Sequence, residues 1–365
     1  MNNLSVLSAV TVVPFSSPSA QNGTPSIHLM QHFERHWAEI LNIPRSDTLI
    51  ELSKSHSLVR NALLAVTASH LRHVSPGVLQ HRIAEHFQQT LAIHDCRKLI
   101  SVPPAELGQS GVNILMLSTV LLNMLAFTLP ESDITTGSRS RSEPDPSTSW
   151  VFSPHENRLG WLALQAGTRP MLRAADAYFE PAMNLLSQIF LRPGDNSWTQ
   201  RRLSHSLEGV PAKWIKFLSL DGSTHDGTGN PCEIPGGPIT RITPELYGNI
   251  FRPAVVALSR SLNVPRHDFN IFKDLPFLSK VHSELRTLLY LRDERALWLF
   301  GYWLGLMSRY EGLWWSEKRV RRDYKAIRMW LDQAHVISRP GAEGEMWREM
   351  MVEFDNAAVF PPPES

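Results

Sequence analysis

The sequence is 365 residues long, which is enough for one large domain or two ordinary ones. Its 36 Lys and Arg residues nearly balance its 35 Asp and Glu residues, so no overall field draws the chain toward nucleic acid or an anionic membrane. Only two cysteines, Cys96 and Cys232, are present. This excludes a disulfide framework or a cysteine-rich zinc module within the chain, and it fits a reducing, cytosolic or nuclear compartment.

Residues 1–25 are rich in Ser, Pro and Asn, and we expect them to form a flexible leader. The apolar run LSVLSAVTVV, residues 4–13, has the hydrophobicity of a signal peptide, but no Lys or Arg precedes it. A secretory signal normally carries a positive region before its apolar part. Secretion is therefore the weaker interpretation.

Four helices are predicted before residue 131, because apolar residues recur at helical spacing. Their ranges are 27–43, 57–74, 78–100 and 112–129. The second carries one apolar face, made by Val59, Ala62, Leu63 and Val66. The third aligns Ile83, Phe87 and Leu91 at four-residue spacing. The fourth is uncharged and just long enough to span a bilayer, but polar residues dilute it, so we predict a buried helix and no membrane span.

Two long loops are predicted near 131–154 and 219–242, where turn formers replace core residues. Further helical patterns cover 156–174, 176–191, 212–220, 244–262, 278–291, 296–315, 316–334 and 345–358. No segment shows the alternation and hairpin signals of β-strands. The predicted fold class is all-α: a single large helical array, one domain over 26–360, interrupted by the two loops.

The stretch ALWLFGYWLGLMSRYEGLWW, residues 296–315, contains four tryptophans and two tyrosines. Its uncharged part, 296–307, is too short to span a bilayer, so it predicts a central helix that is buried on every side. Large aromatic side chains with polar edges also favour apolar ligand pockets. The candidate ligand-binding residues are Trp298, Tyr302, Trp303, Met307, Trp314 and Trp315.

Four segments resemble, in the same order, a known regulatory domain. LRDERALWLFGYWLGLMSRYEGLWWSEKRVRRDYKAIRMWL, residues 291–331, is similar to the C-terminal segment of the fungal-specific domain of six-cysteine binuclear zinc-cluster transcription factors, of the sterol uptake control protein type. HLMQHFERHW, HSLVRNALLAVTASHLRHVSP and RLGWLALQAGTRPMLRA resemble earlier segments of that domain. The resemblance runs from about Ile27 to Leu331, which is nearly all of the predicted folded part.

The resemblance implies an all-helical, dimerising regulator of transcription in the nucleus, or one that shuttles to the cytoplasm. Sterol-responsive members hold a sterol in an apolar cavity, so a sterol or another apolar small molecule is the implied ligand. DNA-binding members also carry six zinc-binding cysteines, and this chain has two. We therefore expect no sequence-specific DNA binding by the chain alone, and action as a homodimer or with a zinc-cluster partner on a metabolic or secondary-metabolite gene set. No cofactor, bound metal or catalytic residue is expected.

Two histidine patterns could suggest a metal site. His28, His32 and His36 share one face of the first predicted helix, but one straight helix aims at most two such ligands at one ion. HRIAEH, residues 81–86, is one residue longer than the H-x-x-E-H zinc-protease pattern. A polar helix face and a chance near-match are the preferred interpretations.

Two further alternatives stay open. An aromatic interior suits a terpene-cyclase-like enzyme, in which aromatic faces stabilise carbocations, but the sequence has no DDxxD cluster to hold magnesium and diphosphate. The run KRVRRDYKAIR, residues 318–328, could contact phosphates, although such a run is more often a solvated or docking face.

Overall fold

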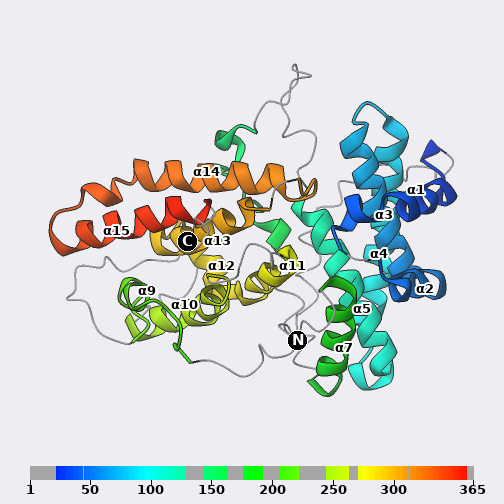
Figure 1. The fold of residues 1–365 in the computed structure, drawn as a ribbon, viewed down its shortest axis with the longest axis horizontal. Coiled ribbons are helices and arrows are strands. Elements are labelled where there is room, and N and C mark those ends of the chain that lie inside the picture. The colour runs from blue at the N-terminus through cyan, green and yellow to red at the C-terminus, as the bar shows by residue number, and fades with distance from the viewer. Residues whose placement is uncertain are drawn as a thin grey trace, which may run out of the picture. The chain divides into compact units, whose positions relative to one another are not determined.

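The structure is a computed structural model that describes residues 22–43, 45–128, 144–162, 176–191, 206–221, 244–262, 270–310 and 312–359. These ranges contain thirteen α-helices, a few short 3-10 turns and no strand (Figure 1). The predicted all-α class is confirmed. Most of the predicted leader and loops, residues 1–21, 131–143 and 222–242, lies outside the described residues.

The helices fall into two compact units. The first comprises the described residues of Met1–Arg202 and Tyr310–Arg322, and the second those of Leu203–Arg309 and Asp323–Ser365. The division falls inside one helix, α14 (Glu317–Gln333).

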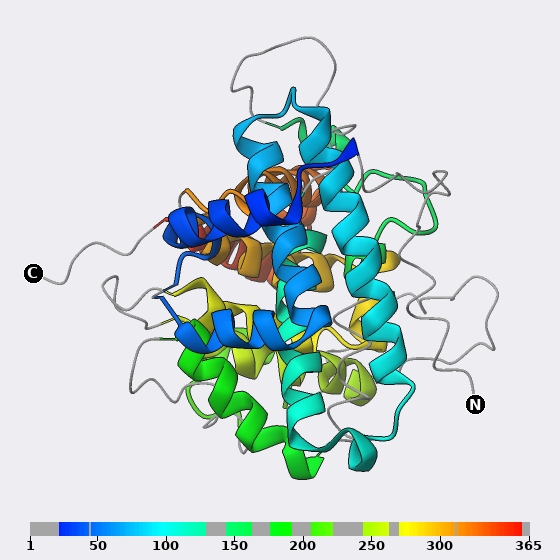
Figure 2. The same cartoon turned by 90° about the vertical axis from the view of Figure 1, so that its right-hand side faces the viewer.

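In the first unit the central helix is α3. Its helices are α1 (Ser26–Leu41), α2 (Asp47–Ser55), α3 (Ser57–Val74), α4 (Leu79–Ile100), α5 (Pro104–Phe127) and α7 (Asp176–Phe190). α3 packs against α1, α2, α4 and α5, and Figure 2 shows it beside α4. Residues 62–70 are buried without a break. The four residues predicted for the apolar face are all buried. The prediction that only one face is buried is wrong, because neighbouring helices cover this part of α3 on every side.

α4 buries a different stripe from the one that the sequence predicts. Its buried residues are Ala84, Glu85, Gln88, Ala92 and Cys96, whereas Ile83, Phe87 and Leu91 are only half-buried. The reason is close packing: the small side chains of Ala84 on α4 and Ala68 on α3 belong to one buried cluster. Small residues let two helices approach, so the larger apolar residues lie at the edge of the contact.

α5 begins eight residues before the predicted start at residue 112, at Pro104, and it bends at Gly108, whose φ of 61° suits glycine. From Gly111 onward most of its side chains are buried against α3, α4 and α7. Within the described residues it is the one helix long and apolar enough to cross a membrane, and 67% of that window is buried. Such burial is typical of a core helix.

Two more predictions before α7 differ from the structure. Among the described residues, five helices, not four, precede residue 131, because the sequence did not predict α2. The Ser46 side chain caps the start of α2 by accepting a hydrogen bond from the Leu49 N–H at 3.3 Å. The helix predicted over 156–174 is absent from its described part, 156–162, which forms turns and the 3-10 turn η5 (Gly160–Leu162).

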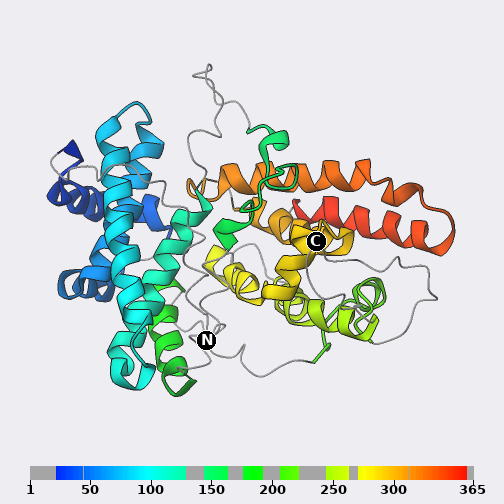
Figure 3. The same cartoon turned by 180° about the vertical axis from the view of Figure 1, so that it is seen from behind.

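In the second unit α13 is central. The helices here are α9 (Ala212–Phe217), α10 (Pro244–Ser259), α11 (Ile271–Asp274), α12 (Ser283–Tyr290), α13 (Glu294–Ser308) and α15 (Gly341–Ala357), with the C-terminal part of α14. α13 packs against α10, α12 and α15, and Figure 3 shows it beside α15. The short α11 has no counterpart among the predicted helices.

Candidate functional site

α13 carries four of the six candidate ligand residues. The Asp293 side chain begins the helix by accepting a hydrogen bond from the Ala296 N–H at 2.9 Å. Every residue from Ala296 to Met307 is buried. The prediction of a central helix that is buried on every side is therefore confirmed.

Trp298 lies in an aromatic cluster that α9 completes. Its ring meets the rings of Trp214 and Phe217 edge-on, with centroids 5.6 and 5.2 Å away. Its Nε1–H donates to the Met350 carbonyl on α15 at 2.8 Å. Both the apolar body and the polar edge of this tryptophan are thus bound within the protein.

Tyr302 lies at the polar edge of the same cluster. Its ring is 4.9 Å from that of Trp214, whose Nε1–H donates to the Glu353 carboxylate at 2.7 Å. Lys213 forms an ion pair with the same carboxylate. Burial raises the pKa of Tyr302 and the negative charge of Glu353 adds to the shift, so the phenol stays protonated at neutral pH. It can donate a hydrogen bond there but cannot serve as a base.

Trp303 and Met307 are the other two candidates on α13. The Trp303 ring stacks on Phe277 at 5.1 Å and lies 5.4 Å from Phe300. Trp303 and Met307 are both fully buried. These contacts are those of a packed core.

α15 approaches α13 closely because two glycines face it. A Cβ added at Gly301 would lie 2.4 Å from the Phe354 ring, and one at Gly305 would lie 2.8 Å from the Ala357 Cβ. A side chain at either position would force its neighbours on α15, or the helix itself, to shift. The glycines therefore set how closely α13 and α15 pack.

The other two candidates, Trp314 and Trp315, belong to the first unit. Trp314 donates from Nε1 to the Ile40 carbonyl on α1 at 2.9 Å, and Trp315 meets Phe127 edge-on at 5.7 Å. The structure thus divides the six candidates into a group of four in the second unit and a pair in the first. Their ligand-binding role stays a prediction.

The arginines of the basic run make contacts within the chain. Buried Arg319 donates from Nε to the Phe127 carbonyl at 2.9 Å, and its guanidinium lies 4.6 Å from the centre of the Trp161 ring. Arg321 pairs with Glu317, one helical turn earlier.

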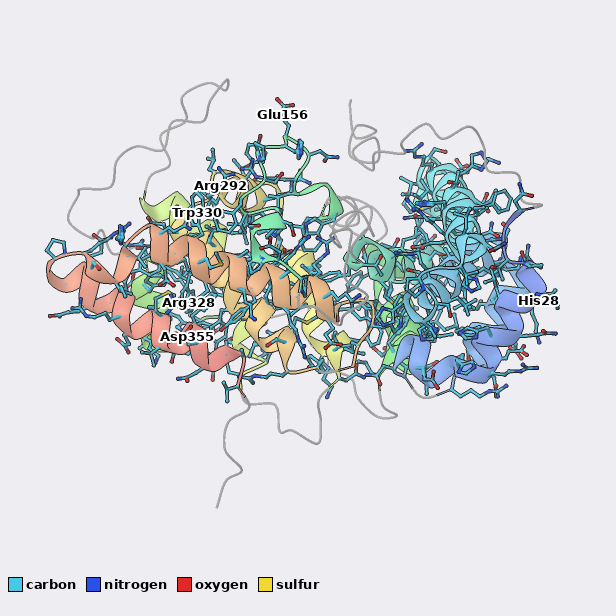
Figure 4. The ribbon with its side chains drawn as sticks, turned by 90° about the horizontal axis from the view of Figure 1, so that it is seen from above. His28, Glu156, Arg292, Arg328, Trp330 and Asp355 are labelled. Carbon is cyan, nitrogen blue, oxygen red and sulfur yellow. The ribbon has the colours of Figure 1, made fainter. Side chains whose placement is uncertain are left out.

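Arg328 follows the same pattern in the second unit. It forms an ion pair with Asp355 at 2.8 Å and another with Asp332 (Figure 4). These contacts favour a structural role for the run over one in phosphate binding.

The histidine stripe of α1 meets a partner that sequence spacing does not reveal. His32 Nε2 lies 3.1 Å from His70 Nδ1 on α3, and the His36 ring stacks on the His32 ring at 4.4 Å. His28 is exposed and points outward (Figure 4). Within the part of the chain that the structure describes, no group of three His, Cys, Asp or Glu side chains is arranged to hold a metal ion.

The near-match HRIAEH separates into unrelated contacts. His81 Nδ1 lies 2.8 Å from the Thr24 hydroxyl, and the buried Glu85 forms an ion pair with Arg72 of α3. These side chains bind different partners, as expected for a chance match.

The sequence analysis did not identify the residues that complete the aromatic cluster around Trp298 and the histidine group of α1. Trp214 lies in AKWIKFLSL, where its apolar neighbours indicate burial but not the helix that it contacts. Glu353 gives a weak signal in the sequence, because Glu349 lies one turn before it on the same helix face. In the structure both carboxylates pair with Lys213. His70 is one of fifteen histidines and gives no local sign of facing α1.

No protein family model, curated protein or solved structure matches this chain.

Proposed function

We propose that the chain is a non-catalytic regulator of transcription, built on a regulatory domain like that of fungal zinc-cluster factors. It acts as a homodimer or with a zinc-cluster partner that supplies DNA binding, in the nucleus, on a metabolic or secondary-metabolite gene set. The observation that carries the proposal is the order of the four resembling segments along the chain. The all-α fold is the class that this resemblance implies.

The residues quoted for the resemblance also make defined contacts, which supports the proposal. In RDERAL, Asp293 begins α13 and the Arg292 guanidinium lies 5.0 Å from the centre of the Trp330 ring (Figure 4). In the WW pair, Trp314 hydrogen-bonds the last turn of α1. Residues that begin a helix or join two segments are the ones that proteins with the same fold would retain.

Gene deletion, followed by transcript and metabolite profiling of the same culture, tests this function. We expect a coherent set of transcripts to fall together with the product that their enzymes make. If the transcripts hold while one metabolite vanishes and its precursor accumulates, the chain is an enzyme and the proposal is wrong. A fluorescent fusion should accumulate in the nucleus.

Two binding measurements test the need for a partner. The purified chain alone should give no sequence-specific gel shift at physiological salt. Fused to an unrelated DNA-binding domain, it should change the expression of a reporter that carries the matching site. A specific gel shift by the chain alone would contradict the partner requirement.

The second candidate is a helical binder of an apolar metabolite, or an enzyme like a terpene cyclase that acts on one. The favouring observation is the aromatic cluster of Trp298, Tyr302 and Trp214, which has a carboxylate and an ammonium group at one edge. Extraction and mass spectrometry of the purified protein should recover a sterol or terpenoid if the cluster holds one. Equal recovery from Trp298→Ala protein would place the ligand elsewhere.

A further inference from the structure

Three aromatic side chains join three segments at one end of the first unit. His32 comes from α1, His70 from α3, and Trp314 from the segment between α13 and α14. The Trp314 ring meets the His70 ring edge-on at 5.2 Å, while its Nε1–H donates to the Ile40 carbonyl in the last turn of α1.

α1 is held first by its buried apolar face, in which Leu29 packs with Leu64 and Ala68 of α3. The histidine pair adds a polar contact at the middle of the helix, and Trp314 adds one at its last turn.

The histidine pair can hold its hydrogen bond only in some protonation states. His32 Nε2 and His70 Nδ1 are 3.1 Å apart, so one nitrogen must donate while the other accepts through its lone pair. A neutral pair or a singly protonated pair meets this condition. A doubly protonated pair has no acceptor, and its two positive rings repel each other.

The surroundings of His70 favour the neutral form. Its pKa is lowered to about 4, chiefly by burial and then by the neighbouring His32 and His73. Glu39 on α1 acts in the opposite direction, and His36 adds a smaller lowering effect.

His32 is surrounded in the same way. Burial and then His36 lower its pKa, Glu39 raises it, and His81 on α4 lowers it slightly. In the described part of the chain, no charged group of α2 or α5, which also pack on α3, acts on either ring.

We propose that the His32–His70 pair and Trp314 form an acid-sensitive latch, which strengthens the attachment of α1 to α3 while the pair carries at most one positive charge and favours local opening of α1 when both rings are protonated. Release is local: α1 separates while α3, α4 and α5 stay packed. The latch makes the attachment of α1 depend on pH in the mildly acidic range.

The sign of the effect follows from the two states. In the attached state both histidines have lowered pKa values and bind protons weakly. In the released state their pKa values return to the ordinary value of 6.5. The released state therefore takes up protons, and its population grows as pH falls below about 6.5. For one proton taken up, the opening constant rises about tenfold per pH unit until the pH nears the lowered value.

Hydrogen exchange of the intact wild-type chain tests the latch directly. Amide exchange of residues 26–41, corrected for the intrinsic pH dependence, should quicken about tenfold per pH unit below about 6.5. The amides of α3 should change much less. If α1 protection stays constant from neutral pH to about pH 5, or if α1 and α3 open together, the latch is wrong.

A double variant separates proton uptake from packing. Gln at position 32 places an amide nitrogen near the His32 Nε2 position, and Asn at position 70 places an oxygen near the His70 Nδ1 position. His32→Gln with His70→Asn thus keeps a hydrogen bond that cannot titrate, and α1 exchange should lose most of its pH dependence. The matched control is His28→Gln, because His28 is exposed one turn earlier on the same helix. That control should keep the wild-type pH dependence, and an unchanged slope in the double variant would overturn the proposal.

Discussion

Individual tryptophans in this chain connect distant segments through both their rings and their indole nitrogens. Trp298 is the clearest case, because its ring packs on α9 while its N–H bonds α15. Trp214 and Trp314 follow the same pattern with Glu353 and Ile40. The sequence analysis assigned Trp298 and Trp314 to a ligand site and did not single out Trp214. The contacts show that tertiary anchoring alone occupies their polar edges.

Truncation at Trp298 should separate packing from hydrogen bonding. Trp298→Ala is expected to lower the free energy of unfolding by about 3–5 kcal/mol, because it empties a buried site. Trp298→Phe keeps most of the ring and loses the bond to Met350, so about 1–2 kcal/mol is expected. Urea denaturation followed by circular dichroism measures both.

The matched control is Val352→Ala, at an exposed position on α15, which should cost no more than about 0.5 kcal/mol. Equal losses for the Ala and Phe variants at position 298 would mean that the hydrogen bond, rather than the ring, dominates.

At the scale of elements, the sequence predicted most of the longer helices but not what surrounds them. The apolar spacing in 57–74 gives α3 its bounds, yet it cannot show that four helices surround it. The stripe of Ile83, Phe87 and Leu91 has the right period for α4, but Ala68 and Ala84 decide which face approaches α3. α2 was missed because its nine residues give too short a pattern. Local periodicity carries no information about which partner comes closest.

The contact between α13 and α15 gives a test at this scale. Gly301→Ala should destabilise the chain by about 1–3 kcal/mol, because the new methyl group would overlap the Phe354 ring and force the helices apart. The gain of about 1 kcal/mol that alanine brings to a helix interior offsets only part of an overlap this close. Thermal and urea denaturation provide the measurement.

Gly77→Ala is the control, since a Cβ there meets no atom within 4 Å. A stabilised Gly301→Ala variant would show that α15 is not held so close to α13.

At the scale of the whole molecule, the two units should respond differently to acid. His32, His70 and His81 all have pKa values lowered chiefly by burial, and all three lie in the first unit. Their contribution to stability is complete above about pH 6.5 and is lost as pH falls toward the lowered values. A second feature at this scale is the division of the six predicted ligand residues between the two units. They form one aromatic stretch in the sequence, and no local pattern could reveal that division.

Comparing urea denaturation at neutral pH and at about pH 5, with hydrogen exchange to assign each transition, tests this difference. We expect the midpoint of the first unit to fall by more than that of the second. Parallel shifts of both units would show that the buried histidines do not govern the acid response.

The burial of Cys96 on α4 turns one thiol into a natural reporter of the fold. Burial raises the pKa of Cys96 to about 11, so at neutral pH the side chain is both shielded and protonated. Alkylating reagents attack the thiolate, and they should reach this residue only when α4 leaves its neighbours. In a Cys232→Ser background, the rate of thiol alkylation would measure how often α4 opens, with no reporter residue introduced into the chain. Rapid labelling of the folded protein would contradict the packing of α4 described here.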